Sequence, residues 1–359
     1  KMLYIDPPYN TGHDFVYKDR FKERESTYKE KTGQHYQINS ETDGRYHTNW
    51  LNMMYPRLRL ARNLLSEEGV IFVSIDYHEL HNSNHMMNEI LGEENYPDQI
   101  IIRRGVKSVQ AQFETVDSLS SGYEFVLVYT KNRHFRFNKV YETLKEEKKG
   151  TWNNHWRGTD RPTMRYELFG IKPSTGQWRW SKERSMRAIE NYKEMVRYFE
   201  QKGIDITDEN IDKWYEQERK KGREPFDLLR LSKNGKPEHY IPPTNKKLLS
   251  NLWTDLKPNG SSQLAKLFDN KVFDMPKSID LIKRLIQFCE GDKNKKEIIL
   301  DFFSGSATTA HAVMDLNGED GGNRKFIMVQ LPEPTDEKSE AYKAGFKTIS
   351  EIGKERIRR

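Results

Sequence analysis

Short apolar runs, each followed at once by an aspartate, recur near both ends of this sequence. Such runs are Met2–Ile5 before Asp6, Val70–Ile75 before Asp76, and Glu297–Leu300 before Asp301. A strand that is apolar on both faces belongs inside a sheet that helices cover on both sides. Segments with helical spacing of apolar residues separate these runs. The alternation therefore predicts an α/β fold with a doubly wound, mostly parallel sheet.

The same patterns predict the remaining elements. We expect further strands at Gln99–Ile102, Phe125–Tyr129 and Arg324–Leu331. We expect helices from an N-cap at Thr48 to a stop at Gly69, from Leu80 to Gly92, from a first turn with Pro276 through Ile286, and over Ala310–Met314. One charged amphipathic helix is expected over Asp336–Arg359 and a solvated one over Ile206–Arg223, with loops at residues 10–46 and 105–122.

Composition limits the environment and the partners. The net charge of +6 and the pI of about 9.0 are a mild basic excess, which fits a polyanionic partner without identifying one. The single cysteine, Cys289, excludes an internal disulfide and a cysteine-cluster zinc site, and we predict that it is a core residue. We predict no metal site. No apolar run reaches the ~20 residues of a membrane span, so we expect a soluble intracellular protein, cut from a longer one at both ends.

The segment Asp6-Pro7-Pro8-Tyr9 follows the first predicted strand. Open α/β sheets bind their ligands at the carboxyl ends of the strands. Each proline lacks an N–H and restrains the residue before it, so carbonyls here stay available as acceptors. Asp6 and the Pro7 carbonyl suit the two N–H groups of an exocyclic amine, with the Tyr9 ring stacked on the base. The alternative is a plain strand-to-loop turn in which Asp6 is a cap.

A second candidate site follows the strand that ends at Asp301. Phe302 to Thr309 is a turn of small residues that leads into a helix, an arrangement typical of nucleotide-like cofactor binding. It lacks the Gly-Lys-Ser/Thr of a P-loop and the three glycines of a dinucleotide motif. Asp301 is unfavourable beside a pyrophosphate and favourable beside an amino group, so S-adenosylmethionine fits better than a dinucleotide.

From Lys131 to about Ser250 the composition changes to Lys, Arg and aromatic residues. This pattern predicts a nucleic-acid surface with cations for phosphates and guanine edges and with aromatics for stacking. The candidate DNA-binding residues are Arg157, Arg161, Arg165, Trp178, Arg179 and Trp180. The alternative is an α+β domain with the tryptophans in its own core and a solvated charged face.

Together the two motifs resemble those of amino-group DNA methyltransferases. Asp6-Pro7-Pro8-Tyr9 resembles their catalytic motif, and Asp301 to Thr309 resembles their cofactor loop. The order, with the catalytic motif first and a basic insert between, resembles the β group of these enzymes. Asp6 to Gly12, Gly176 to Ser181 and Phe326 to Glu333 are similar to modification (Mod) subunits of type III restriction-modification systems.

The resemblance implies roles for individual residues. Asp6, Pro7, Pro8 and Tyr9 match catalytic positions. The positions implied for S-adenosylmethionine are Asp6, Asn10, Lys277, Asp301, Phe303, Ser304, Gly305, Ser306, Thr308 and Gln330. Lys277 matches a position near the cofactor carboxylate, and Gln330 or Glu333 replaces an acid at the ribose. Ala307 stands where a second glycine is usual, and we expect an ordinary backbone conformation there.

The resemblance also implies the domains and the partners. We expect a catalytic half at 1–132, a target recognition domain at 133–250, a cofactor-binding half at 251–335 and a helical segment at 336–359. The implied function is adenine-N6 methylation of double-stranded DNA in a prokaryotic cytoplasm, by a homodimer that joins a restriction (Res) subunit. Cytosine-N4 methylation, RNA methylation and a catalytically idle DNA-binding module are the alternatives.

Overall fold

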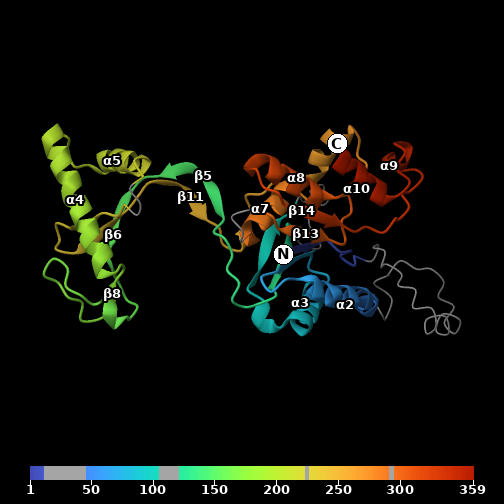
Figure 1. Cartoon of the computed structure of the whole chain (residues 1–359), viewed down its shortest axis with the longest axis horizontal. Coiled ribbons are helices and arrows are strands. Elements are labelled where there is room, and N and C mark those ends of the chain that lie inside the picture. The colour runs from blue at the N-terminus through green and yellow to red at the C-terminus, as the bar shows by residue number, and fades with distance from the viewer. Residues whose placement is uncertain (12–45, 105–120, 223–225, 291–294) are drawn as a thin grey trace, which may run out of the picture. The chain divides into compact units, whose positions relative to one another are not determined.

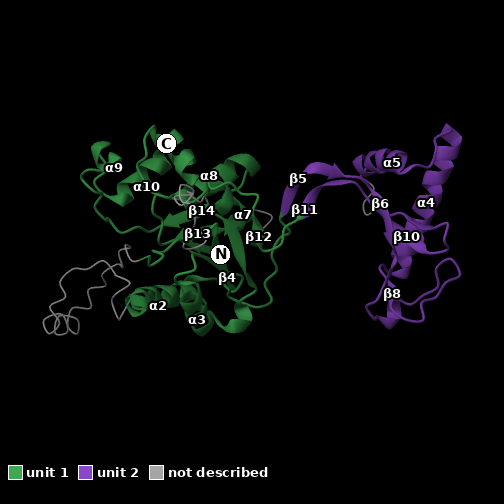
Figure 2. Cartoon of the chain, turned by 180° about the vertical axis from the view of Figure 1, so that it is seen from behind, with its two compact units in different colours: residues 1–140, 248–359 green, residues 141–247 purple. Residues whose placement is uncertain are grey.

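The structure is a computed structural model that describes residues 1–11, 46–104, 121–222, 226–290 and 295–359. The predicted loops at residues 10–46 and 105–122 therefore lie almost wholly outside the described residues. The chain forms two compact units (Figure 2). Unit 1 comprises Lys1–Val140 and Leu248–Arg359, and unit 2 is Tyr141–Lys247. Unit 2 lies within the predicted insert at 133–250, and residues 336–359 belong to unit 1.

Unit 1 is built on a seven-stranded sheet. In spatial order its strands are β12 (Leu252–Trp253), β3 (Asp98–Arg103), β4 (Tyr123–Thr130), β2 (Val70–Ile75), β1 (Met2–Ile5), β13 (Ile298–Asp301) and β14 (Lys325–Met328). Neighbouring strands are parallel except at β4, which is antiparallel to both β2 and β3. The predicted doubly wound, mostly parallel sheet is confirmed, and the reversal of β4 was not predicted.

Helices cover both faces of this sheet (Figure 1). Leu3 and Ile5 of β1 pack with α2 (Tyr46–Leu64) and α3 (Leu80–Leu91), whereas Met2 and Tyr4 pack with α7 (Ile279–Cys289) and α8 (Thr308–Asp320). Side chains alternate between the faces of a strand, so the apolar residues of β1 contribute to a core on each face of the sheet. Cys289 is buried in the second of these cores, as predicted.

The order of the strands creates a switch point between β1 and β13. The chain leaves β1 toward β2 on one side and leaves β13 toward β14 on the other. The two strands are parallel neighbours, with Leu3 opposite Leu300. Crossovers that diverge in this way open a crevice at the carboxyl ends of the strands. The fold thus brings Asp6 and Asp301 to the same edge from opposite ends of the sequence.

Several predicted helix boundaries are wrong. Thr48 is not an N-cap, because α2 already includes Tyr46, and this helix ends at Leu64, before Gly69. Pro276 is not in a first turn, because α7 begins after Ser278. Local sequence defines helix ends poorly, since packing of the apolar face decides how far each helix extends.

The C-terminal segment is not one helix. It contains α9 (Glu340–Lys343) and α10 (Ile349–Arg358), and Gly345 between them has a φ of 95°. A capping box starts α10, with Thr348 and Glu351 bonding each other's backbone. Ala341 and Ile352 pack on α6 (Gly260–Phe268), so both helices belong to a small satellite core of unit 1.

Unit 2 is an α+β unit with short strands. It contains β5 (Tyr141–Lys148) paired with β11 (Thr244–Leu248), a sheet of β6 (Thr151–Asn154), β10 (Pro237–Ile241) and β9 (Leu229–Leu231), and the pair β7 (Trp156–Arg157) and β8 (Gln177–Trp178). Helices α4 (Lys182–Lys202) and α5 (Asp208–Lys220) pack on them, the latter within the predicted solvated helix. Short 3-10 helices occur at Glu93–Asn95 in unit 1 and Pro162–Met164 in unit 2.

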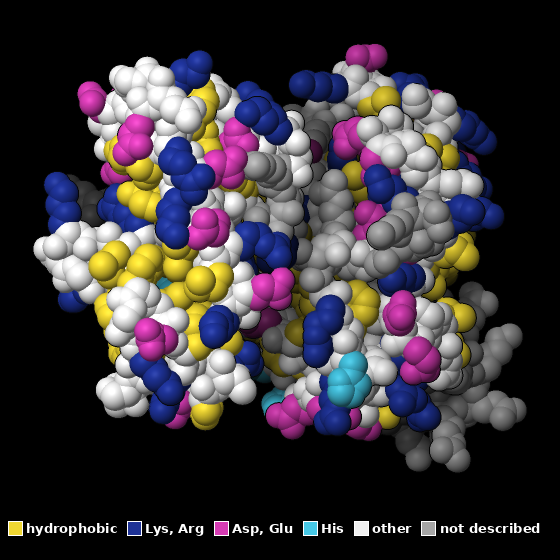
Figure 3. All heavy atoms as spheres, turned by 60° about the vertical axis from the view of Figure 1, so that its left-hand side comes forward, with side chains coloured by type: hydrophobic (Ala, Val, Ile, Leu, Met, Phe, Trp, Pro, Cys, Tyr) yellow, Lys and Arg dark blue, Asp and Glu magenta, His cyan; other side chains and the backbone are white. Residues whose placement is uncertain are grey.

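The described residues contain neither a helix long and apolar enough to cross a membrane nor a metal-binding cluster of His, Cys, Asp and Glu. Figure 3 shows one face of the molecule, where Lys and Arg side chains are spread among Asp and Glu. On that face no single basic patch identifies a partner.

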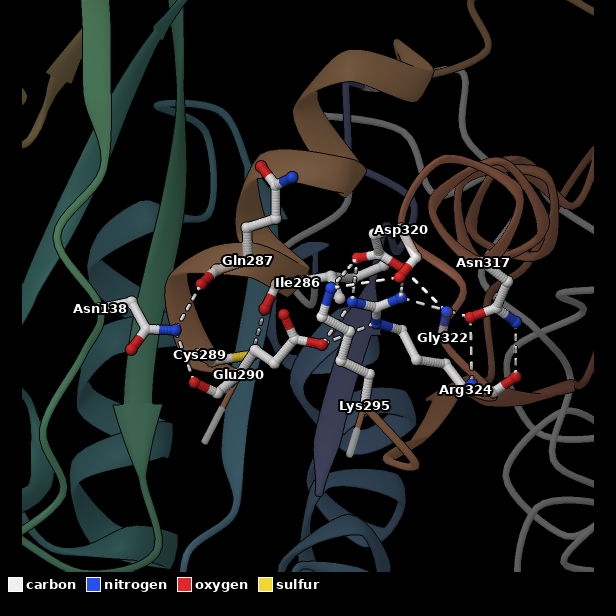
Figure 4. A network of polar contacts seen from close by, with 10 residues as sticks. All are labelled: Asn138, Ile286, Gln287, Cys289, Glu290, Lys295, Asn317, Asp320, Gly322 and Arg324. Carbon is white, nitrogen blue, oxygen red and sulfur yellow. Dashed lines mark hydrogen bonds and ion pairs between the residues drawn. The ribbon is translucent and has the colours of Figure 1, made fainter. Parts of the chain in front are cut away.

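A buried arginine joins the helices beside the edge strand of the sheet. Arg324 donates to Glu290 Oε1 from Nε at 2.8 Å and to Asp320 Oδ2 from Nη2 at 2.8 Å (Figure 4). Its side chain is fully buried, and Asn317 accepts from its backbone N–H. Arg324 thus connects the end of α7, the end of α8 and the start of β14.

Arg324→Ala is expected to lower the free energy of unfolding by about 3 kcal/mol, because it leaves two carboxylates without their buried partner. Urea unfolding followed by circular dichroism measures the loss. The matched control is Lys343→Ala, which removes an exposed cation paired with Glu340 and should cost less than about 0.5 kcal/mol. Equal effects of the two substitutions would contradict the structural role of Arg324.

Candidate active site

The Asp6-Pro7-Pro8-Tyr9 segment leaves β1 at the carboxyl edge of the sheet and is held on both sides. Trp50, fully buried in α2, donates from Nε1 to the Pro8 carbonyl at 2.7 Å. The Tyr9 hydroxyl donates to Asp6 Oδ1 at 3.0 Å. No donor from the described residues reaches the Pro7 carbonyl. The turn therefore keeps one backbone acceptor beside the Asp6 carboxylate.

Lys277 joins this segment to a carboxylate that the sequence analysis missed. Its ammonium lies 2.7 Å from Glu124 Oε2 and 3.5 Å from Asp6 Oδ1, and it also donates to the Tyr9 hydroxyl. Glu124 is near the start of β4, and Phe125 pairs with Ile75 at the carboxyl end of β2. Because β4 is antiparallel, its beginning lies at the edge where the parallel strands end.

The charges in this cluster influence each other. Burial raises the pKa of Asp6, Lys277 partly opposes that rise, and Glu124 adds to it. Burial alone would lower the pKa of Lys277, but Asp6 and Glu124 raise it above its ordinary value. Lys277 is therefore protonated at neutral pH and sits between two carboxyl groups. Its role near a cofactor carboxylate stays a prediction, since its contacts in this structure are with the Asp6 segment.

Asn10 is buried, and a second acid that the sequence analysis missed holds it. Its Nδ2 donates to Glu79 Oε1 at 2.5 Å, and its φ of 58° is left-handed. Glu79 is fully buried and also lies 2.7 Å from His47 Nδ1 and accepts from Asn82 Nδ2 at 2.7 Å. The Asn10 amide thus anchors the exit of the segment to α3.

Asp301 lies at the carboxyl end of β13 and is buried. Its Oδ1 accepts from the Phe303 N–H at 3.1 Å, and its Oδ2 accepts from the Thr309 hydroxyl at 2.6 Å. Burial raises the pKa of this carboxyl to about 7, although both hydrogen bonds favour the charged form. The nearby charge of Asp6 contributes to the rise. Asp301 therefore changes its charge near neutral pH.

The loop from Phe302 to Ala307 contains two left-handed residues. Gly305 has a φ of 48°, and Ala307 has a φ of 58°. The expectation of an ordinary backbone at Ala307 is wrong: this residue keeps a glycine-like conformation and buries its methyl group. Such a conformation costs an alanine roughly 1 kcal/mol, so the surrounding structure must hold it.

The residues after β14 reach this loop. The Gly305 N–H donates to Gln330 Oε1 at 2.7 Å, and Gln330 Nε2 lies 3.4 Å from Glu333 Oε2. The Ser304 N–H donates to the Val329 carbonyl at 3.2 Å. Both candidates for the ribose position are thus near the loop, and Gln330 already uses its amide oxygen to hold it. Phe303, Ser304, Ser306 and Thr308, the other candidate cofactor residues, are buried.

The six candidate DNA-binding residues of unit 2 are four arginines and two tryptophans, and the arginines are the first group. Arg157, Arg161 and Arg179 are exposed. Arg165 is ion-paired with Asp160 at 2.5 Å, and it donates to the Gly176 carbonyl at 2.8 Å.

The tryptophans form the second group. Trp178 is 2% exposed and donates to the Tyr166 carbonyl at 2.7 Å. Trp180 is half-buried, with the Arg184 guanidinium 4.6 Å from its ring. Both tryptophans pack in the core of unit 2, as the alternative interpretation of the insert expected. Trp178 therefore offers no surface to DNA in this structure.

Residues of the segment Gly176 to Ser181, which resembles Mod subunits, have structural roles in unit 2. Gly176 has a φ of 68°, and a Cβ there would lie 2.5 Å from both the Arg157 carbonyl and the Trp156 ring. Ser181 caps α4 by accepting from the Arg184 N–H. These residues fold the unit: Arg157 pairs with Gln177 in the β7–β8 pair, and the Arg179 N–H, directly after β8, donates to the His155 carbonyl at 3.0 Å.

Asp301→Asn is expected to alter the pH dependence of stability. Because the folded pKa of Asp301 is about 7, the unfolded chain loses this proton first as pH rises from about 4. The free energy of unfolding of the native protein should therefore fall by roughly 4 kcal/mol between pH 4 and pH 7, and that of the variant should not show this fall. Urea unfolding at pH 4, 5.5 and 7 measures the difference, with Asp274→Asn, an exposed aspartate, as the control. A difference between native and variant that does not change with pH would refute the raised pKa.

Comparisons with known proteins agree with the geometry. The chain is 32% identical over 384 residues to the StyLTI Mod subunit, a type III restriction-modification enzyme of Salmonella typhimurium, covering 100% of this chain and 53% of that protein. The EcoP15I Mod subunit of Escherichia coli is 30% identical, over 99% of this chain and 59% of its own. The type II methyltransferase M.KpnI of Klebsiella pneumoniae is 29% identical, over 98% and 80%.

The chain thus spans little more than half the length of these two Mod subunits. Among solved structures, the cytosine-N4-specific PvuII DNA methyltransferase has a TM-score of 0.44 and 9% identity, over 99% of this chain and 85% of its own. That likeness is too weak to add to the fold described above. Residues 1–335 match the family model for DNA methylases of the N6/N4 type. The chain belongs to this DNA methylase family, as its two motifs indicated.

Proposed function

We propose that this protein transfers a methyl group from S-adenosylmethionine to the N6 amine of an adenine in duplex DNA, as the Mod subunit of a type III restriction-modification system. The observation that carries the proposal is the placement of Asp6 and Asp301 at the carboxyl ends of two adjacent parallel strands. Family membership and the names of the Mod relatives support it.

The residues of the loop fit S-adenosylmethionine, which would supply an activated methyl group on a sulfonium. Asp301 lies at the end of β13, directly before the loop, and its negative charge favours an amino group over a phosphate there. The left-handed Gly305 packs against the Phe273 ring and gives the loop its tight turn, and Gln330 and Glu333 provide polar groups for ribose hydroxyls. Lys277, whose ammonium contacts Glu124 and Asp6 in this structure, is the proposed partner of the cofactor carboxylate.

Asp6 and the Pro7 carbonyl are the proposed acceptors for the two amine hydrogens. The Pro8 carbonyl is already bonded to Trp50, so Pro7 supplies the backbone acceptor. Accepting both hydrogens favours a pyramidal nitrogen, and the Asp6 carboxylate stabilises the positive charge that develops during methyl attack. The raised pKa of Asp6 makes it a better acceptor for the proton that the methylated nitrogen loses.

Glu124 and Tyr9 prepare Asp6 for this role. Glu124 holds the Lys277 ammonium at 2.7 Å, closer than its 3.5 Å separation from Asp6, so Asp6 keeps lone pairs for the amine. The Tyr9 hydroxyl bond to Asp6 fixes the ring that would stack on the base. The amine of a paired adenine cannot reach Asp6, so the base has to flip out of the duplex.

Asp6→Ala should lower methyl transfer at least about 100-fold, because it removes the acceptor that stabilises the developing charge. Transfer of labelled methyl to duplex DNA measures the rate, and a gel-shift assay checks that DNA binding is retained. Glu319→Ala, at an exposed side chain on α8, is the control and should keep native activity. Turnover by the Asp6 variant at a native rate would rule out this assignment.

Unit 2 is proposed to bind the target DNA through Arg157, Arg161 and Arg179. These side chains are exposed: Arg157 lies in β7, Arg179 directly follows β8, and Arg161 lies in the segment that connects the two strands. Phosphate contacts of this kind supply affinity and orientation, and contacts to base edges supply specificity. We further propose, from the resemblance to Mod subunits, a homodimer that joins a Res subunit in a prokaryotic cytoplasm; the relatives' names support only the Mod assignment.

Replacing Arg157, Arg161 and Arg179 together by alanine should weaken duplex DNA binding and make it less sensitive to salt. Each lost phosphate contact should reduce the slope of log affinity against log salt by about 1. Fluorescence anisotropy at several salt concentrations measures both quantities. The matched control replaces Arg187, Lys193 and Lys213, exposed cations already paired with glutamates on their own helices. Equal losses in the two triple variants would contradict a specific surface.

A further inference from the structure

Helix α10 lies outside residues 1–335 and yet packs directly on the cofactor loop. A Cβ added to Gly353 would lie 3.2 Å from the Gly305 carbonyl and 3.4 Å from the Ala307 Cβ. Ile352 on the same helix is buried against α6. The helix is therefore held firmly on one side and touches both left-handed residues of the loop on the other.

Arg356 extends this contact with hydrogen bonds. Its Nη1 donates to Ser306 Oγ at 3.0 Å, to the Ser306 carbonyl at 3.3 Å and to Thr308 Oγ1 at 2.8 Å. Its Nε lies 3.3 Å from His311 Nδ1. One guanidinium thus binds Ser306, which lies between the left-handed Gly305 and Ala307, and also binds the first turn of α8.

This arginine is kept in place at an energetic cost. The residue is 1% exposed, and within the described part of the chain its guanidinium forms no ion pair with a carboxylate. Its Nη2 is buried without a hydrogen-bond partner in that part. Burial lowers the pKa of Arg356 to about 10, and Asp315 opposes this only partly. A cation beside a helix N-terminus is also disfavoured by the helix dipole.

Arg356 is a buried cation whose hydrogen bonds all go to neutral groups of the cofactor loop and of the first turn of α8. An apolar side chain would fill the same space without the desolvation cost. What only the guanidinium provides is a set of donors that fix the Ser306 carbonyl, and with it the orientation of the two left-handed neighbours. Gly305 and Ala307 can otherwise relax to other backbone conformations.

We propose that Arg356 is a positioning residue for the cofactor loop, so that α10 is part of the cofactor-binding apparatus. The inference deepens the proposed function, since it names a further determinant of S-adenosylmethionine affinity. Arg356 holds the loop from outside and touches none of the groups that act on the amine. Its loss should therefore affect cofactor affinity and leave the methyl-transfer step unchanged.

The first test measures the loop without any cofactor. Hydrogen exchange of the peptide that spans residues 302–309 should be at least 10-fold faster in full-length Arg356→Gln than in the native protein. Arg358→Gln, an exposed neighbour on the same helix, should exchange like the native protein. Unchanged exchange in the Arg356 variant overturns the inference, whatever the protein's function.

The second test measures S-adenosylmethionine affinity by calorimetry, well below each variant's melting temperature. Arg356→Gln should weaken binding about 10-fold and raise the KM for the cofactor by a similar factor, with kcat at saturation near native. Arg356→Lys should be intermediate, and it replaces the Gln variant if that variant does not fold. A lowered melting temperature with native affinity would make Arg356 merely structural and overturn the inference. If the native protein binds no S-adenosylmethionine, the proposed function fails and this second step fails with it.

Discussion

The parallel pairing of β1 with β13 is the constraint on which the site depends. These strands come from opposite ends of the described chain. The strand that follows β1, β2, lies on the side of β1 away from β13, and the strand that follows β13, β14, lies on the side of β13 away from β1. Because the crossovers diverge, they open a crevice at the edge where Asp6 and Asp301 emerge. The core on each face of β1 stabilises this pairing, since alternate residues of the strand pack under different helices. The site is thus a consequence of strand order.

Carboxyl groups outnumber cations at that edge, so Lys277 does not neutralise all of them. Lys277 lies between Asp6 and Glu124, and the buried Asp301 has a pKa of about 7. A site with three carboxyl groups and one ammonium favours a ligand that brings positive charge, as an amino-acid sulfonium does. It disfavours the phosphates that many α/β folds bind at the same edge. The electrostatics and the sequence of the loop therefore agree on the class of cofactor.

Much of the fold could be predicted because apolar runs and helical spacing are local signals. The aspartates at strand ends could be placed for the same reason, which made Asp6 and Asp301 predictable. Glu124 could not, because a buried strand has the same apolar pattern in either direction and β4 runs opposite to its neighbours. The conformation of Ala307 could not either, since a left-handed backbone at an alanine has no local sequence signal, and the helix that packs against it, α10, is distant in sequence. In unit 2, a basic aromatic stretch fits both a DNA surface and a core, and only packing showed that Trp178 is buried.

The measurement that tests the central claim most directly is transfer of labelled methyl from S-adenosylmethionine to mixed-sequence duplex DNA by the full-length protein, followed by nucleoside analysis. We predict that the label appears in N6-methyladenine. Label in N4-methylcytosine would keep the cofactor and contradict the base assignment. No label, together with no binding of S-adenosylmethionine, would contradict the account of the site as a whole.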